Sequence, residues 1–228
     1  MKIGGFQKLS LVDFPGTVSA VAFTPGCGFS CSYCHNPDLI SPGREEVFTV
    51  SEVIDELKKS RRMIDGVVIT GGEPTIHEGL AEFLKEVRRL ELLIKLDTNG
   101  MHPFSVEQII KNNLVDYIAM DIKSSWKKYS SVTGIAMDER LIRNCGKTLS
   151  IIQDSGIDHE FRTTVFPAVH SLDDFREIAS YLIPGEKSFL QKIRPQTTLS
   201  SLEEELSHPE GIAAVLREEF PLISIEAR

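Results

Sequence analysis

Residues 24–37 read TPGCGFSCSYCHNP and place Cys27, Cys31 and Cys34 directly after an apolar run with the character of a β-strand. The spacing C-x3-C-x2-C can gather three thiolates around one metal centre, with a fourth coordination position that has no cysteine ligand. Thiolates favour zinc or iron–sulfur clusters among biological metals. The segment therefore predicts a metal site on a loop after a strand, and the incomplete ligand set indicates catalysis.

Three interpretations of these cysteines are open. His35 could complete a zinc site, although ligands so close in sequence would require a cramped loop, since zinc ligand pairs usually come from separated knuckles. A disulfide framework fits poorly, because three clustered cysteines and Cys145 stand in a chain without a signal peptide. Cys145 lies in a predicted helix and is better explained as a small buried hydrophobe. We favour a [4Fe–4S] cluster with one iron open to a small molecule.

A second motif, Gly71-Gly72-Glu73-Pro74, follows the apolar run at 66–71. Alone it predicts an ordinary turn after a strand. Taken with the cysteines, it resembles the radical S-adenosylmethionine (SAM) superfamily, whose cluster motif carries an aromatic residue, here Tyr33, before the last cysteine. The resemblance implies that SAM binds the open iron and that the GGE motif contacts its methionine part.

Bulk properties narrow the class of protein. The 228 residues suffice for one buried domain, so we expect a single domain over 1–228. No apolar stretch approaches the roughly 18 residues that cross a bilayer. The first residues also lack the apolar core of a secretory signal. Together these features predict a cytoplasmic protein that is not membrane-bound. The net charge of −8 disfavours a general nucleic-acid binder.

Alternating strand and helix signals predict the fold class. Because such alternation produces right-handed βαβ units, we expect a parallel sheet in an α/β protein, and about six units would form a partial (β/α)6 TIM barrel. The radical SAM resemblance implies the same fold. The expected strands are 17–24, 66–71, 93–100, 115–123, 159–166 and 188–193. The expected helices are 51–63, 78–90, 105–113, 138–155, 171–182 and 213–219, with Ser51 and Ser105 as N-caps, Gly156 as a C-terminal stop and a loop at 200–211.

Charged residues close several of the expected strands, at the sheet edge where α/β proteins bind ligands. Asp97 and Asp121 end the third and fourth strands, Arg162 lies in the fifth, and Arg194 closes the sixth. Buried charges are costly unless they are paired, which favours a functional role. The alternatives are that the aspartates cap turns and that the arginines face solvent.

A narrower resemblance is to the glycyl-radical-enzyme activating proteins, the group that includes pyruvate formate-lyase activating enzyme. It is carried by YCHN at 33–36, by Asp97-Thr98, and by Met120-Asp121-x-Lys123. It implies a monovalent cation beside the SAM carboxylate, held by Asp97, Thr98, Met120 and Asp121, and a lysine that supports SAM binding. The candidate cofactor-binding residues are therefore Tyr33, His35, Asn36, Gly71, Gly72, Glu73, Pro74, Asp97, Thr98, Met120, Asp121, Lys123 and Arg162.

The opening GFQKLSLVDFPG at 5–16 and the short chain are most similar to the branch that activates anaerobic ribonucleoside-triphosphate reductase. The resemblance implies reductive cleavage of SAM, abstraction of hydrogen from a glycine of that partner, and a flavodoxin- or ferredoxin-type reductant. Three alternatives stay open: an activase of a pyruvate formate-lyase-like enzyme, a small-molecule radical SAM enzyme similar to 7-carboxy-7-deazaguanine synthase, and a non-catalytic metal or electron-transfer module.

Overall fold

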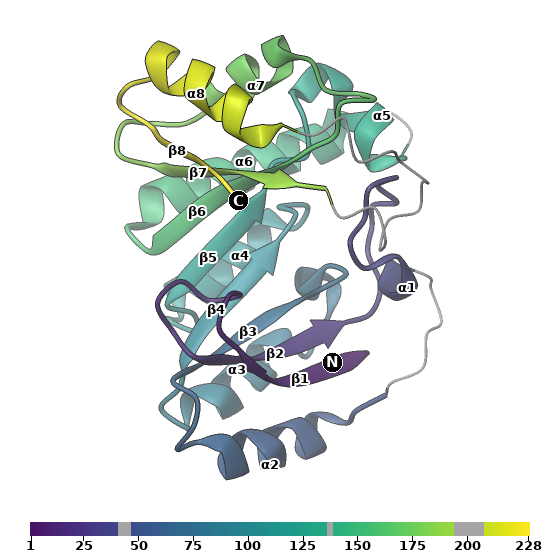
Figure 1. Ribbon diagram of the computed structural model, residues 1–228. Helices are drawn as coiled ribbons and strands as arrows, with labels where there is room; N and C mark the ends of the chain where they lie inside the picture. Colours follow the sequence, from purple (N-terminus) through teal and green to yellow (C-terminus); the bar gives the residue numbers. More distant parts are fainter. Residues whose placement is uncertain (41–46, 136–138, 194–207) are drawn as a thin grey trace.

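The computed structural model describes residues 1–40, 47–135, 139–193 and 208–228. One eight-stranded sheet runs through them, and its strands lie side by side in sequence order. Figure 1 shows this sheet curving from β1 near the N-terminus to β8 near the C-terminus. The strands are β1 (Gly5–Ser10), β2 (Ser19–Thr24), β3 (Gly66–Gly71), β4 (Leu93–Thr98), β5 (Tyr117–Asp121), β6 (Asp158–Val165), β7 (Lys187–Lys192) and β8 (Ser224–Ala227).

All neighbouring pairs from β2 to β8 are parallel, and only β1 runs antiparallel to its neighbour. The sheet order begins at β1 and ends at β8, so the barrel is partial. Parallel strands place their carboxyl ends at one edge, which brings the loops after β2, β3, β4 and β5 together. The α/β class and the partial-barrel architecture expected from the sequence are confirmed.

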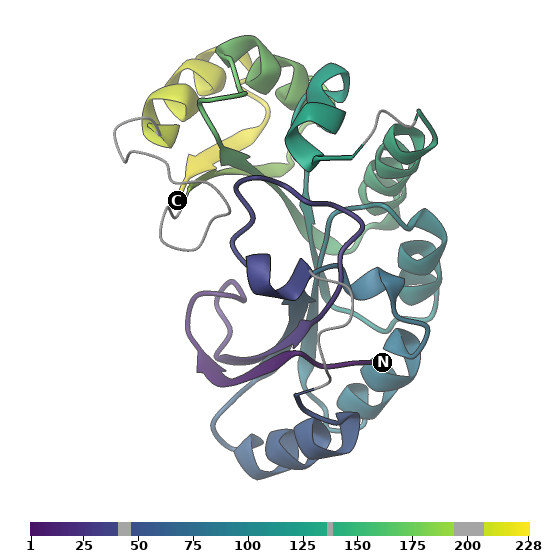
Figure 2. The same cartoon turned by 90° about the vertical axis from the view of Figure 1, so that its right-hand side faces the viewer.

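The helices lie mainly on the outer, convex side of the curved sheet, while α1 and the loop before it lie on the inner side (Figure 2). Several are amphipathic; in α2, for example, the apolar side faces the core through Val53, Ile54 and Leu57. The helices are α1 (Pro37–Ile40), α2 (Val50–Ser60), α3 (Leu80–Arg88), α4 (Pro103–Lys111), α5 (Tyr129–Thr133), α6 (Glu139–Ser155), α7 (Leu172–Ala179) and α8 (Pro209–Glu219).

Three predicted helix starts were wrong. α8 begins at Pro209 rather than at Ala213, so residues 209–211 of the predicted loop are helical. Thr49, not Ser51, is the N-cap of α2: its hydroxyl accepts from the Glu52 N–H at 3.2 Å, and its own N–H donates to Glu52 Oε2 at 2.8 Å. α4 begins at Pro103 rather than after Ser105, because proline is well suited to the first helical position. The predicted stop at Gly156 is confirmed by its positive φ of 71° directly after α6.

All six predicted strands are present, and two further ones were missed. β1 has three consecutive exposed residues and lies at one edge of the described sheet, and β8 has four residues at the other edge. Such short edge strands carry little hydrophobic periodicity. Arg194, and residues 200–207 of the predicted loop, lie outside the described residues. In the described part of the chain, no helix has both the length and the apolar character to cross a bilayer.

Candidate active site

The three cysteines lie on the loop between β2 and α1, are free thiols, and line one cavity of about 950 Å³. Backbone hydrogen bonds fix this loop near its start and in its middle. The N–H of Gly26 donates to the Leu39 carbonyl at 2.6 Å, and the N–H of Ser30 donates to the Thr133 carbonyl at 2.8 Å. The thiols are therefore presented to the cavity by a loop that is tied to α1 and α5.

Nitrogen donors point at two of the sulfurs. The backbone N–H groups of Phe29 and Asn36 donate to Cys27 Sγ at 3.3 Å and Cys34 Sγ at 3.4 Å, and the Asn99 side-chain amide donates to Cys27 Sγ at 3.5 Å. Such donors stabilise negative charge on sulfur. Burial raises the pKa of Cys27 to about 11 and of Cys31 to about 12, opposed in part by the positive charge of Lys123. Loading a metal would therefore release protons from these thiols.

The donor set fits an iron–sulfur cluster better than a zinc ion. Within the described residues, no group of three His, Cys, Asp or Glu side chains is placed to hold a single metal ion. The described residues therefore do not form the ligand set of one tetrahedral zinc ion, with or without His35. An iron–sulfur cluster is larger than one ion and is held by thiolates, and three reduced cysteines on one cavity meet that requirement.

The GGEP turn packs directly on the cysteine loop. The N–H of Gly72 donates to the Thr24 carbonyl at 2.7 Å, and the N–H of Glu73 donates to the Gly26 carbonyl at 2.8 Å. Gly71 has a φ of 115°, and a Cβ at Gly72 would lie 1.9 Å from the Gly26 oxygen. No other residue could make this approach without displacing the backbone. Gly71 and Gly72 also line the cavity, as predicted for a SAM-binding motif.

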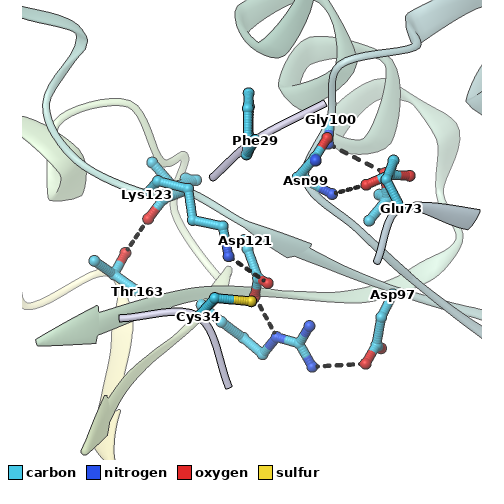
Figure 3. Close-up of polar contacts among 12 residues, drawn as sticks. Phe29, Cys34, Glu73, Asp97, Asn99, Gly100, Asp121, Lys123 and Thr163 are labelled. Atoms are coloured by element: carbon cyan, nitrogen blue, oxygen red, sulfur yellow. Dashed lines mark hydrogen bonds and ion pairs between the residues drawn. The ribbon is translucent and has the colours of Figure 1, made fainter. Parts of the chain in front are cut away.

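The Glu73 carboxylate faces the protein interior, and the residue is only 1% exposed. Its Oε1 accepts from the Thr75 N–H and the Thr98 hydroxyl at 3.1 and 2.8 Å, and its Oε2 accepts from the Asn99 N–H at 2.6 Å. Figure 3 shows Glu73 beside Asn99 and Gly100. Burial raises its pKa, while these hydrogen bonds oppose that rise. The Glu73 side chain thus links the ends of β3 and β4. Of the GGEP motif, the two glycines face the cavity.

Five charged side chains alternate in sign along the cavity wall. Asp97 lies between Lys95 (2.9 Å) and Arg162 (3.1 Å), and Asp121 lies between Arg162 (2.8 Å) and Lys123 (2.9 Å). Figure 3 shows Lys123 directed at Asp121, with Asp97 on the far side of the group. Burial opposes ionisation of both aspartates, but the adjacent cations outweigh it and lower both pKa values. Burial likewise opposes the charge on Lys123, and Asp121 outweighs it and raises the lysine pKa.

Aromatic side chains from three elements hold the Lys123 backbone. Its carbonyl accepts from the Tyr33 hydroxyl at 3.1 Å and lies 2.9 Å from His170 Nε2, while its N–H donates to the Tyr129 hydroxyl at 3.4 Å. His170 Nδ1 accepts from the Phe166 N–H at 3.1 Å, so Nε2 carries the proton. Burial lowers the pKa of His170 to about 4. Tyr33 thus couples the cysteine loop to Lys123 through its side chain.

Most predicted site residues meet at the cavity, namely Cys27, Cys31, Tyr33, Cys34, His35, Asn36, Gly71, Gly72, Asp97, Thr98, Asp121, Lys123 and Arg162. Glu73 turns inward, Pro74 is buried at the start of a 3-10 turn, and the Met120 side chain is fully buried in the core. Prediction missed Lys95, Asn99 and Glu160, which also line the cavity. A signal existed for two of them, since Lys95-x-Asp97 and Glu160-x-Arg162 place charged pairs on one face of a strand.

Comparison with known proteins identifies the same superfamily that the cysteine and GGEP motifs resemble. Residues 21–182 match the family model described as the radical SAM superfamily. A protein of Methanocaldococcus jannaschii named as a glycyl-radical enzyme activating enzyme is 32% identical over 196 residues, which are 85% of this chain and 80% of that one. The pyruvate formate-lyase-activating enzyme of Clostridium pasteurianum is 28% identical over 188 residues, 79% of this chain and 76% of the relative.

The fold is also similar to solved structures. Streptococcus suis SuiB bound to S-adenosylmethionine superimposes with a TM-score of 0.70 at 12% identity. The match covers 91% of this chain and 51% of SuiB, so the chain spans about half the length of that protein. At this identity the similarity concerns the fold alone.

Proposed function

Since the chain belongs to the radical SAM superfamily, whose members use a [4Fe–4S] cluster and SAM, we propose that it is a glycyl-radical-enzyme activating enzyme. The observation that carries this proposal is one cavity that joins three free cysteines, the GGEP glycines and the Lys123–Asp121–Arg162 group. The names of two relatives, which the chain covers over most of their length, support the activase class.

In this proposal Cys27, Cys31 and Cys34 would hold the [4Fe–4S] cluster. When bound and reduced, the cluster would supply the single electron for reductive cleavage of SAM. The chain's own residues orient SAM and shield it from water. Lys123 gives the cavity wall positive charge that a methionine carboxylate requires, and the glycines of GGEP let SAM approach the backbone. Phe29 and Tyr33, which are 2% exposed, help to exclude water.

The partner would be a protein that offers a glycine hydrogen. Glycine has no side chain to block approach, and a radical on its Cα is delocalised over the adjacent amides. A sheet that is not closed between β1 and β8 is compatible with entry of a peptide loop. We propose anaerobic ribonucleoside-triphosphate reductase as this partner and a flavodoxin- or ferredoxin-type protein as reductant. Four free thiols suit a reducing compartment, which favours the cytoplasm.

The test is anaerobic reconstitution with iron and sulfide, followed by reduction in the presence of SAM and a candidate partner. We expect 5′-deoxyadenosine to form and a doublet glycyl signal to appear on the partner by electron paramagnetic resonance. A signal on a pyruvate formate-lyase-like enzyme alone would reassign the partner within the activase class. SAM cleavage that depends on a small molecule and gives no protein radical would refute the activase proposal.

A further inference from the structure

The residues that the family resemblance assigns to a monovalent cation do not fit that role as they are arranged in this chain. All four carboxylate oxygens of Asp97 and Asp121 lie within ion-pair distance of a side-chain cation. Lys95 lies 2.9 Å from Asp97 Oδ1, and Arg162 lies 3.1 Å from Asp97 Oδ2. On the other carboxylate, Arg162 lies 2.8 Å from Asp121 Oδ1 and Lys123 lies 2.9 Å from Asp121 Oδ2.

The remaining side-chain oxygen of that set is also engaged. The Thr98 hydroxyl donates to Glu73 Oε1 at 2.8 Å and accepts from the Gly100 N–H at 3.1 Å. Thr98 is 3% exposed, so its hydroxyl could turn toward an ion only by breaking two buried hydrogen bonds. Asp97 Oδ1 makes no hydrogen bond and is held only by the charge of Lys95, whereas the other carboxylate oxygens and the Thr98 hydroxyl are hydrogen-bonded within the folded chain.

Charge balance argues in the same direction. Lys95, Arg162 and Lys123 supply three positive charges against two from Asp97 and Asp121, which leaves this group at +1. Glu160, the next carboxylate, lies 4.0 Å from Arg162 and is itself paired with Arg228 at 2.6 Å. The side chains of the group are mostly buried, with exposed fractions from 3% for Lys95 to 26% for Asp121. An additional cation would be repelled, and displacing a buried guanidinium would leave charges unpaired.

The strands build this arrangement directly. Lys95 and Asp97 lie two residues apart in β4 and so share a face, and Arg162 is the register partner of Asp121 across β5 and β6. The guanidinium thus lies between the two carboxylates because of strand pairing, with no loop rearrangement required. Its position is that of a bridging ion.

We propose that Arg162, assisted by Lys95, is a built-in replacement for the monovalent cation, so that this chain binds SAM without sodium or potassium. The proposal concerns SAM binding, which follows from family membership, and it does not depend on which partner is activated. Its failure would leave the activase proposal untouched.

The first test measures SAM affinity of the reconstituted enzyme in potassium, sodium and choline chloride at equal ionic strength. Affinity is read from the SAM-induced change in the electron paramagnetic resonance spectrum of the reduced cluster and from equilibrium dialysis, neither of which requires turnover. We expect the dissociation constants to agree within about twofold. A loss of affinity of about tenfold or more in choline, reversed by potassium or sodium, would overturn the proposal.

The second test uses Arg162→Gln, which keeps much of the volume and loses the charge. We expect this variant to become cation-dependent, binding SAM about tenfold more weakly in choline than in potassium or sodium. The matched control, Arg143→Gln, removes an arginine that is 70% exposed and should behave as the native chain does. If Arg162→Gln weakens SAM binding equally in all three salts, Arg162 contacts SAM directly. The proposal that Arg162 takes the place of the cation is then refuted. Circular dichroism and iron content establish folding; should the variant not fold, the salt series on the native chain decides.

Discussion

The loops after β2 and β3 contribute thiols and glycines to the cavity, whereas β4, β5 and β6 contribute charged side chains at or near the ends of the strands. In the loops, neighbouring residues in the sequence act together, as in residues 27–34 and 71–74. In the strands, the partners come from different elements, as when Arg162 meets Asp97 and Asp121. The loop region can thus be encoded by residues close together in the sequence. The strand region, where charged side chains pair, depends on strand register.

The largest expected effect lies in the loop region. Cys31→Ala should reduce iron from about four atoms per chain to near zero and abolish SAM cleavage, because two thiolates cannot anchor the cluster. The measurement is iron and sulfide content after anaerobic reconstitution. Cys145→Ala is the matched control, since Cys145 is fully buried and its thiol contacts the Asn99 carbonyl. Retained iron in Cys31→Ala, or its loss in Cys145→Ala, would contradict the assignment.

The second-largest effect is expected at Glu73, where the loop region meets the strand region. Glu73→Gln should lower the free energy of unfolding by about 3 kcal/mol, because both carboxylate oxygens accept from backbone N–H groups and an amide would turn its own donors toward one of them. Urea unfolding measures this. Glu82→Gln, on an exposed face of α3, is the control and should be near neutral. Equal stability of the two variants would show that the buried carboxylate does not link β3 to β4.

Beside the strand region, the buried His170 between β6 and α7 should make stability depend on pH. The folded pKa is lowered to about 4 from 6.5, so the unfolded chain binds a proton first as the pH falls. The stability associated with the neutral imidazole is complete above pH 6.5 and declines toward pH 4. Between pH 7 and 5 this amounts to about 2 kcal/mol. His170→Gln should show a correspondingly flatter curve of unfolding free energy against pH, and identical slopes would refute the prediction.

The smallest effect is expected on the outer surface of the C-terminal half. Arg176 pairs with Glu219 through two hydrogen bonds at 2.8 and 2.7 Å, joining α7 to α8. Because solvent screens this pair, Arg176→Ala should shift the melting temperature by less than about 2 °C and leave iron content and SAM affinity unchanged. A change in SAM affinity would mean that this half of the molecule acts on the cavity through more than its inward-facing residues.

Much of the fold was predictable because the central parallel strands are continuous apolar runs, such as β3, whose first four residues are buried. The edge strands β1 and β8 were missed because edge positions do not require apolar residues on both faces. Helix starts were misplaced where several capping residues compete, as with Thr49 and Ser51. Lys95 was missed because the spacing Lys95-x-Asp97 places two charges on one face of a strand but does not show that this face is buried. The contacts of Lys95 with Asp97 and with the Asp13 carbonyl explain its burial.

The sequence by itself determined the cofactor chemistry, because three cysteines at fixed short spacing and a glycine pair after a strand constrain metal and backbone geometry within a few residues. Only the tertiary structure decided that the Glu73 carboxylate turns inward, that His170 holds the Lys123 carbonyl, and that Arg162 bridges two aspartates. Those contacts join residues 25 to 65 positions apart in the chain. Their energies depend on strand register and burial, which no local pattern of residues specifies.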